Sequence, residues 1–386
     1  MKFLKYLAIS LLILTIIGYI LYQRYPVNPA LKITAQEYEG GLPLEKLKLP
    51  AGFQIDVYSD DVENARSLCL SPNGTLFVGT RGKGSVYALV DNDKDGRADK
   101  KYILMEDGKM PNGVAFKDGD LYVAEVSRIL KFSDIENNLD NPGTPEVVYD
   151  KYPTETHHGW KYIAFGPDDR LYVPVGAPCN ICESEDKVFA SITSIKPDGT
   201  DMRIEQEGVR NTVGFDWNPE TGVMWFTDNG RDWLGDDSPE CELNKTTGAK
   251  GHFGYPYCHQ GNILDPEFGA NKDCDDYIAP VVNLGPHTAP LGVEFYAGSN
   301  FPDEYKSIYV ARHGSWNRAE KIGYDVVRVT KKADGSYEWL PFISGWLSDD
   351  KTEVWGRPVD VEVMPDGSML ISDDYGDAIY RVYYKP

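Results

Sequence analysis

The chain has 386 residues, of which 41% are hydrophobic and 12% aromatic, and its formal net charge is −21 at neutral pH. Because this charge is spread along the chain, it argues against nucleic acid or an anionic membrane surface as a partner. The aromatic content, with 25 tyrosines, favours strands over helices, and the length suits one large β domain.

The N-terminus, residues 1–25, is apolar from residue 6 to residue 22, with Lys2 and Lys5 before the apolar segment. This length is at the short end of a membrane span. No small-x-small cleavage site follows, so we expect an uncleaved signal anchor with its lysine end inside, and a cleaved signal peptide is the alternative. Either interpretation predicts an exported, periplasmic or otherwise extracytoplasmic protein.

Six cysteines suit an oxidising compartment. Cys258 and Cys274 bracket a polar loop and are predicted to form a disulfide. The sequence CNIC at 179–182 lacks the two further ligands of a zinc site, and Glu183 stands where a haem-attachment motif requires histidine. A short disulfide across this loop is therefore the favoured interpretation.

One phrase recurs along the chain, a turn rich in Pro, Asp, Gly and Asn followed by alternating apolar residues. Such a phrase predicts a hairpin whose second strand is half-buried. Repeats of this spacing are typical of propeller blades, so the sequence predicts an all-β, six-bladed propeller. The six copies are SPNGTLFVGT (71–80), FKDGDLYVAE (116–125), GPDDRLYVPVG (166–176), NPETGVMWFTDNG (218–230), FPDEYKSIYVARHG (301–314) and MPDGSMLISDD (364–374).

The domain boundaries follow from this repeat. Residues 26–48 have no clear periodicity and are predicted to be a tether, whereas 49–386 form the propeller. Propellers usually close by pairing their first and last strands, so IYRVYY at 379–384 is expected beside FQIDVYS at 53–59. The motifs GxGxxG, GxxxxGK, GxSxG and HExxH are absent, which removes the usual signatures of nicotinamide, P-loop, serine-hydrolase and zincin chemistry.

Candidate functional residues stand at the expected blade edges, where a propeller carries its chemistry. His158, on a Gly-flanked loop, is a candidate general base, although a single histidine is more often structural. Arg210 and Asn211 precede a strand, and a second turn combines Asn229, Gly230 and Arg231. With the carboxylates that follow, Asp236, Asp237 and Glu240, this turn suits calcium, and an acidic surface loop is the alternative.

Two further segments combine arginine with tryptophan, ARHGSWNR (311–318) and EVWGRPVDVEVMPDG (353–367). Arginine forks and aromatic faces suit an anionic, planar ligand, and structural salt bridges are the competing explanation. The segment DNDKDGRAD (91–99) matches an EF-hand loop at positions one, three, five and six, but position twelve is Tyr102. A plain hairpin connection and a calcium site both fit it.

With these residues the chain resembles the soluble pyrroloquinoline quinone (PQQ)-dependent sugar dehydrogenases, in particular their sorbosone dehydrogenase-like branch. The resemblance extends over residues 49–384, nearly all of the exported part. It implies a six-bladed propeller that holds PQQ over its channel with calcium (Ca²⁺) and arginine side chains. The blocks that carry it are GVRN, FTDNGRDWLGDDSPECELN, GYPYC, HTAPLGVEFY and ARHGSWNR.

The resemblance also implies residue roles. His158 matches the general base, and Arg210 with Asn211 matches the pair that contacts the quinone oxygens, where Arg210 stabilises negative charge. The backbone carbonyls of Gly230 and Arg231 match the calcium ligands. Asp236 and Asp237 match an acidic pair near calcium, and Arg357 matches a partner of a cofactor carboxylate. The substitutes for a cofactor-binding lysine are Arg312, Trp316 or Arg318.

Two positions depart from the glucose-oxidising branch, because Val213 replaces a glutamine and Val359 an arginine. They weaken the expectation that glucose is the substrate. The predicted function is PQQ- and calcium-dependent oxidation of an aldose or related sugar aldehyde to a lactone or acid. Without a haem motif in the chain, electrons pass to an external quinone or cytochrome. The alternatives are a cofactor-free binding module and a calcium-dependent lactonase.

Overall fold

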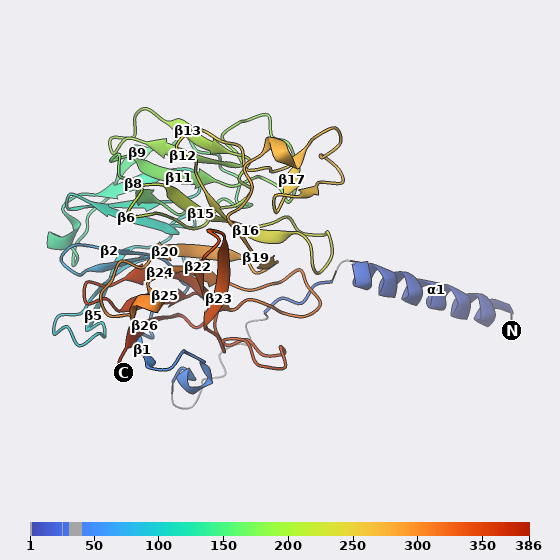
Figure 1. Cartoon of the computed structure of the whole chain (residues 1–386), viewed down its shortest axis with the longest axis horizontal. Helices are drawn as coiled ribbons and strands as arrows, with labels where there is room; N and C mark the ends of the chain where they lie inside the picture. Colours follow the sequence, from blue (N-terminus) through green and yellow to red (C-terminus); the bar gives the residue numbers. More distant parts are fainter. Residues whose placement is uncertain (1, 25, 31–40) are drawn as a thin grey trace.

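The computed structural model describes residues 2–24, 26–30 and 41–386. Its body is a ring of six four-stranded antiparallel sheets, so the predicted all-β, six-bladed propeller is confirmed (Figure 1). The first three blades, each from its inner to its outer strand, are β2 (Ala65–Leu70), β3 (Leu76–Thr80), β4 (Val86–Val90), β5 (Lys100–Met105); β6 (Gly113–Lys117), β7 (Asp120–Ala124), β8 (Ile129–Phe132), β9 (Glu146–Tyr149); and β10 (Ala164–Phe165), β11 (Leu171–Val175), β12 (Ser191–Ile195), β13 (Arg203–Glu207).

The other three blades follow the same order. They are β14 (Phe215–Trp217), β15 (Met224–Asp228), β16 (Glu240–Lys245), β19 (Val282–Pro286); β20 (Pro290–Phe295), β21 (Ile308–Arg312), β22 (Asp325–Lys331), β23 (Tyr337–Ile343); and β24 (Pro358–Val363), β25 (Met369–Asp373), β26 (Ala378–Tyr384), β1 (Phe53–Ser59). Short 3-10 turns are η1 (Leu44–Lys46), η2 (Ile135–Asn137), η3 (Cys274–Asp276) and η4 (Asp303–Tyr305).

Each recurring phrase marks the hairpin between the first two strands of one blade. In the first copy Leu70 pairs with Leu76 across a turn in which Gly74 has a φ of +94°, a conformation that a side chain would strain. The strand after this turn, β3, is buried along its whole length. The repeat therefore predicted both the number of blades and the position of their first hairpins.

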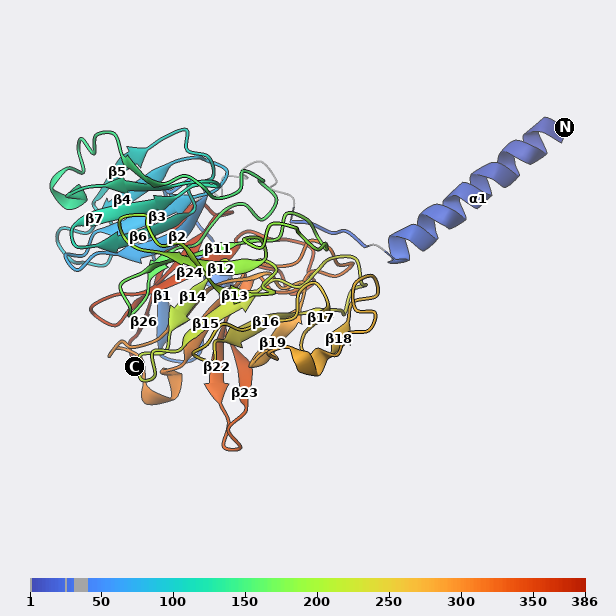
Figure 2. The same cartoon turned by 90° about the horizontal axis from the view of Figure 1, so that it is seen from above.

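The inner strands surround a central channel. Figure 2 shows four of them, β2, β6, β14 and β24, near one another in the body of the propeller. Strand β2 packs against β6 and β24, and β20 packs against β14 and β24. Apolar clusters fill the space between neighbouring blades; for example, Phe77 and Val86 of the first blade lie in one cluster with Val114 and Leu121 of the second. Burial on both faces leaves the blade ends as the places where polar side chains gather.

The ring closes by pairing of its first and last strands, as predicted. Strand β1 runs antiparallel to β26, with Phe53 opposite Tyr384 and Val57 opposite Tyr380. Figure 1 shows the two strands side by side near the C-terminus. The last blade is therefore assembled from both ends of the chain.

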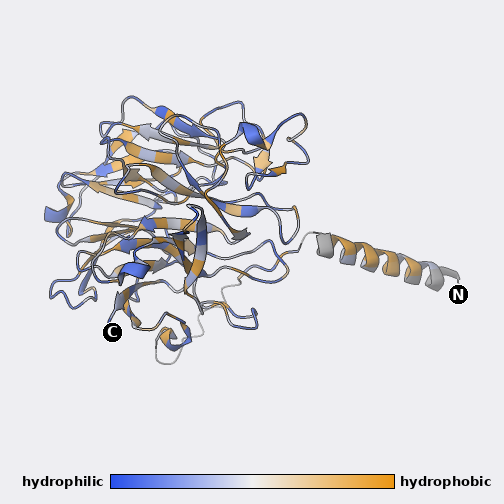
Figure 3. Ribbon diagram, in the orientation of Figure 1, coloured by the Kyte–Doolittle hydropathy of each residue, from blue (hydrophilic) through white to orange (hydrophobic). Residues whose placement is uncertain are grey.

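The N-terminal segment forms helix α1 (Lys2–Arg24), which Figure 3 shows as hydrophobic along most of its length. Large apolar side chains of this helix are exposed, including Leu14 and Ile20. Among the helices of the described residues, none reaches the combination of length and hydropathy that a bilayer crossing demands.

Part of the predicted tether is bound to the propeller. The Pro26 carbonyl accepts a hydrogen bond from Asn317 Nδ2, and the Asn28 N–H donates to the Trp316 carbonyl. Farther along, Leu47 is buried in the core. The described residues on either side of 31–40 thus contact the β21–β22 loop and the last blades.

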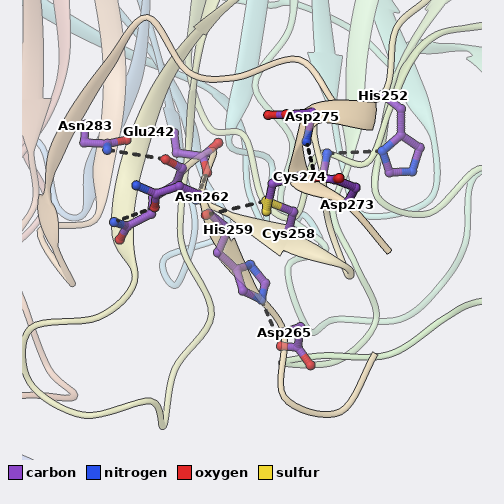
Figure 4. Close-up of a disulfide and its surroundings, with 12 residues drawn as sticks. Glu242, His252, Cys258, His259, Asn262, Asp265, Asp273, Cys274, Asp275 and Asn283 are labelled. Atoms are coloured by element: carbon purple, nitrogen blue, oxygen red, sulfur yellow. Dashed lines mark hydrogen bonds and ion pairs between the residues drawn. A yellow bond between two sulfur atoms is a disulfide. The ribbon is translucent and has the colours of Figure 1, made fainter. Parts of the chain in front are cut away.

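Both predicted disulfides are present, Cys179–Cys182 and Cys258–Cys274. The second lies in the long segment that connects β16 to β19, which also contains the short strands β17 (Cys258–His259) and β18 (Ile263–Leu264) (Figure 4).

Candidate functional site

A cavity of about 360 Å³ lies at the end of the channel where the inner strands begin. It contains seven of the residues that the sequence singled out, brought together from four different blade edges. A separate hollow of about 420 Å³ beside Glu183 and His252 contains none of them. The seven residues are His158, Arg210, Asn211, Asn229, Gly230, Trp316 and Arg357.

His158 is held in one orientation on the cavity wall. Its Nδ1 lies 2.9 Å from the Ala177 carbonyl oxygen and donates to it, which leaves Nε2 with a free lone pair. Burial, and then Arg210 and His157, hold the pKa of His158 well below its usual value, so the ring is neutral at pH 7. A neutral, oriented imidazole is suited to accept a proton.

Gly176 permits this placement of His158. A Cβ atom at position 176 would lie 2.5 Å from His158 Cβ, so any side chain there would displace the histidine. His158 itself has a φ of +50°, in the left-handed region that non-glycine residues seldom occupy. Strained backbone of this kind is concentrated at functional sites.

Arg210 and Asn211 are positioned by Asp228, at the end of β15. The two Asp228 carboxylate oxygens accept the backbone N–H groups of Arg210 and Asn211 at 2.8 and 2.6 Å. The Arg210 guanidinium then donates to the Asn229 carbonyl at 3.0 Å and contacts Asp232 at 3.2 Å. The arginine is thereby fixed with one edge toward the cavity.

Asn180 completes this arrangement, and the sequence did not indicate it. Its carbonyl and side-chain oxygens each accept a hydrogen bond from Arg210 at 2.9 Å. Asn180 lies within the loop that the Cys179–Cys182 disulfide closes. The predicted disulfide therefore does more than tighten a loop, since the loop that it closes also holds Arg210 at the cavity.

The cavity contains more positive charge than its carboxylates neutralise. Arg66 and His313 share Asp374, at 2.6 and 2.7 Å. Arg357 instead donates to two backbone carbonyls, at 3.0 Å each, and the Arg81 guanidinium lies 3.7 Å above the Trp160 ring. Among the described residues, no carboxylate forms an ion pair with Arg81 or Arg357, so both remain available to an anion.

No sequence pattern indicated Arg66, Arg81 or His313 as a site residue. Arg81 directly follows the first repeat phrase, and His313 lies within the fifth. The end of each repeat phrase is therefore a signal for cavity residues, and it indicates both Arg81 and His313. Arg66 had no such signal, because its partner Asp374 is 308 residues away.

Arg312 and Arg231 point away from the cavity. Arg312 forms an ion pair with Asp325 at 2.6 Å and lies 4.2 Å above the Trp339 ring. Arg231 binds the buried Asp265 at 2.5 Å, and His259 contacts the same carboxylate at 2.9 Å (Figure 4). Both side chains have structural partners, although the predicted role of Arg231 concerns its backbone carbonyl.

Arg318, Asp236 and Asp237 form a separate group beside the cavity. Arg318 contacts Asp237 at 3.0 Å and donates to the Asp236 carbonyl at 2.5 Å, and Asp236 accepts the N–H of Ala319. These residues connect the loop after β15 to the loop after β21. None of the three lines the cavity.

Val213 and Val359 lie in one apolar cluster with Leu291, against which Trp160 packs. Leu291 and Trp160 also line the cavity, so the two valines support an apolar floor beneath it. Val213 and Val359 therefore lie at the floor of the cavity, apart from its histidine and arginines.

These residues fit a planar, multiply charged anion such as PQQ. The unneutralised Arg81 and Arg357 provide positive charge, and Trp160 and Trp316 provide flat apolar faces. On the wall that includes Gly230, the side chains of Asn211, Asn229 and Asp232 provide the oxygen donors that calcium prefers.

Comparison with known proteins agrees with this fold. An uncharacterized protein of Borreliella burgdorferi is 32% identical over 355 residues, which cover 88% of this chain and 91% of the relative. A PQQ-dependent pyranose dehydrogenase of Coprinopsis cinerea is 44% identical over 83 residues, 22% of this chain but only 10% of that protein.

Two solved structures have the same fold at low identity. A family AA12 carbohydrate-active enzyme of Trichoderma reesei superposes with a TM-score of 0.76 at 20% identity, covering 88% of this chain and 98% of the enzyme. The PQQ domain of the Coprinopsis cinerea pyranose dehydrogenase gives 0.72 at 18% identity, covering 87% and 97%. The model of the TrAA12-like family matches residues 47–384, which confirms the resemblance drawn from the sequence, and the chain belongs to this family.

Proposed function

We propose that the protein is a PQQ- and calcium-dependent oxidoreductase that oxidises a sugar hydroxyl or hydrated sugar aldehyde to a lactone or acid. The observation that carries the proposal is the pairing of a neutral, oriented His158 with two unneutralised arginines in one cavity. The family membership and the named activity of the Coprinopsis cinerea relative support it.

In this proposal each residue has a defined task. Arg81 and Arg357 would bind cofactor carboxylates, Arg210 and Asn211 would hold the quinone oxygens, and Gly230 would help to hold the calcium ion. When bound, the quinone supplies the oxidising power by taking two electrons from the substrate. His158 Nε2 accepts the proton of the substrate hydroxyl, since its Nδ1 is committed to Ala177.

The remaining parts of the proposal concern the setting. Residues 49–386 are the catalytic domain, and residues 1–25 direct export, with residues 6–22 as an anchor. The two disulfides support an oxidising location. The two electrons leave to a separate acceptor, a membrane quinone or a cytochrome.

A lactonase is supported less well. Such an enzyme binds its metal through side chains from several blades. In residues 41–386 the one group of three acidic, histidine or cysteine side chains at metal-ligand spacing is on a hairpin of the first blade, outside this cavity.

The test uses the full chain in mild detergent, treated with a chelator and then given calcium and PQQ. We expect the quinone to bind at micromolar concentration and a dye acceptor to be reduced with an aldose or ketoaldehyde substrate. His158→Gln should bind the quinone but lose turnover, whereas His252→Gln, at the separate hollow, should keep it. Binding without turnover on any sugar would favour a binding module, and absence of binding would refute the enzyme.

A further inference from the structure

A second cation site is indicated on the outer edge of the first blade, away from the cavity. Residues 91–99 connect β4 to β5, the two outer strands of this blade. Carboxylate oxygens of Asp91, Asp93 and Asp99 all lie within 4.8 Å of one another. Two oxygens that share one calcium ion at 2.3–2.6 Å can be no more than about 5 Å apart, so this spacing already fits a common ion.

One oxygen of each carboxylate is occupied by the loop backbone. Asp91 Oδ2 accepts the Gly96 N–H at 2.9 Å, Asp99 Oδ2 accepts the Asn92 N–H at 2.6 Å, and Asp93 Oδ1 accepts the Asp95 N–H at 3.2 Å. These bonds fix the carboxylates while leaving their second oxygens for a ligand. Asp91 Oδ1 is buried and has no hydrogen-bond partner.

A buried tyrosine beside the loop also lacks a partner. Tyr58 is 0% exposed, and its hydroxyl makes no hydrogen bond. Its backbone carbonyl accepts the Ala98 N–H at 2.9 Å, which fixes β1 against the loop. Ala98 also packs against the apolar cluster that contains Tyr58, so this side chain lies against the segment that leads into Asp99. Two unpartnered buried oxygens, Asp91 Oδ1 and the Tyr58 hydroxyl, beside one loop point to an absent ligand.

Neighbouring basic side chains do not neutralise the cluster. Arg97 lies 3.6 Å from Asp60, Lys100 lies 3.5 Å from Asp140, and Lys101 lies 2.5 Å from Asp61. In the part of the chain that the structure describes, no lysine or arginine forms an ion pair with the three carboxylates. Three like charges at this separation repel one another unless a cation lies between them.

We propose that residues 91–99 bind one calcium ion through Asp91, Asp93 and Asp99. Calcium is favoured over magnesium because it accepts oxygen ligands in irregular geometry, which three carboxylates of one short loop can supply, whereas magnesium requires near-octahedral geometry and retains its waters. The missing glutamate at EF-hand position twelve does not prevent this, since Asp99 supplies a carboxylate from the start of β5. The ion would join β4, β5 and β1, and it would be independent of any calcium in the cavity.

The test is calcium titration by calorimetry of the full, chelator-treated chain without PQQ. We expect one ion per chain with a dissociation constant at or below about 10⁻⁴ M. The unfolding temperature should rise with calcium concentration, because an ion that binds only the folded state stabilises it. Asp91→Asn with Asp99→Asn should weaken binding at least about tenfold, because it removes two of the three ligand charges. Magnesium at the same concentrations should not reproduce either effect.

The matched control is Asp198→Asn, which changes an exposed aspartate in the β12–β13 hairpin, on another blade. It should bind calcium as the unchanged chain does. Circular dichroism of the double variant checks its folding, and Asp93→Asn alone provides a second, milder variant. Equal binding by the loop variants and the control, or no binding by the unchanged chain below about 1 mM, would overturn the proposal.

Discussion

The two ends of the central channel differ in the ionisable side chains that line them. Arginines line the end where the inner strands begin, whereas Asp216, Glu294 and Glu362 lie where three of the same strands end. Among the described residues, no cation forms an ion pair with these three carboxylates. Burial raises the pKa of Asp216 to about 6 and, with Asp360 adding to the effect, that of Glu362 to about 8.

The difference lies in how each end can lose its charge. A buried carboxylate takes up a proton and becomes neutral. An arginine cannot do the same: burial, and then Arg66, lower the pKa of Arg81 only to about 10, which leaves it charged at pH 7. The arginine end therefore needs an anion from outside, and the acidic end needs only solvent protons.

The largest change in stability should come from replacing an arginine that already forms an ion pair within the protein. Arg312→Gln removes the partner of Asp325 and a hydrogen bond to the Leu284 carbonyl, so we expect the free energy of unfolding to fall by about 3–5 kcal/mol. Urea denaturation measures it. Arg81→Gln should change stability by less than about 1 kcal/mol, because it breaks no ion pair. Equal losses would erase the distinction between paired and unpaired arginines.

Affinity for PQQ tests the unpaired arginine. Arg81→Gln should weaken PQQ binding by about 10- to 100-fold, and the difference should shrink at high salt. Equilibrium titration of the quinone absorbance measures it. Arg97→Gln, which removes an exposed arginine outside the cavity, is the control and should bind PQQ normally. A loss of the same size in both variants would mean that net charge, and not this site, governs binding.

A smaller change is expected when the support of Arg210 is removed. Asn180→Ala deletes one of its two contacts to Arg210 and should lower kcat about tenfold with little change in stability. Steady-state kinetics with a dye acceptor separate kcat from KM. If KM alone rises, Asn180 acts on substrate binding and does not position Arg210.

The acidic end should show a small, pH-dependent effect. The folded-state pKa of Glu362 is raised above its unfolded value, so its contribution to stability is full below about pH 4.3 and is lost as pH rises through about 8. Glu362→Gln should therefore stabilise the protein more at pH 9 than at pH 5. We expect the change in the free energy of unfolding caused by the substitution to be about 1 kcal/mol more favourable at pH 9. Urea denaturation at both pH values measures it, with the exposed Glu353→Gln as control. A gain that does not vary with pH would exclude protonation as the cause.

Local pattern was sufficient for the propeller and part of its site. The turn-and-strand phrases predicted six blades because both the turn and the alternation depend only on residues that are close together in the sequence. The disulfides followed from short spacings, and His158 from a Gly-flanked loop. These features depend on residues close together in sequence.

The residues that lie outside the cavity, and those that no sequence pattern indicated, depend on distant partners. Arg312 has the same local surroundings as a ligand-binding arginine, and only the register of β21 with β22 places Asp325 against it. Arg81 belongs to the cavity because Trp160, from another blade, lies beneath its guanidinium. The contacts of Pro26 and Asn28 with the β21–β22 loop join residues about 290 positions apart, which no repeat or motif encodes.

Closure by β1 and β26 sets an order of events during synthesis. Gln54 contacts Tyr383, 329 residues later, so β1 leaves the ribosome long before its partner exists. At about 5–20 residues per second the wait is about 15 to 65 s. During that time β1 is an unpaired strand edge, which favours aggregation. A premature stop before β26 would make this temporary state permanent, so the final few codons decide whether the ring closes.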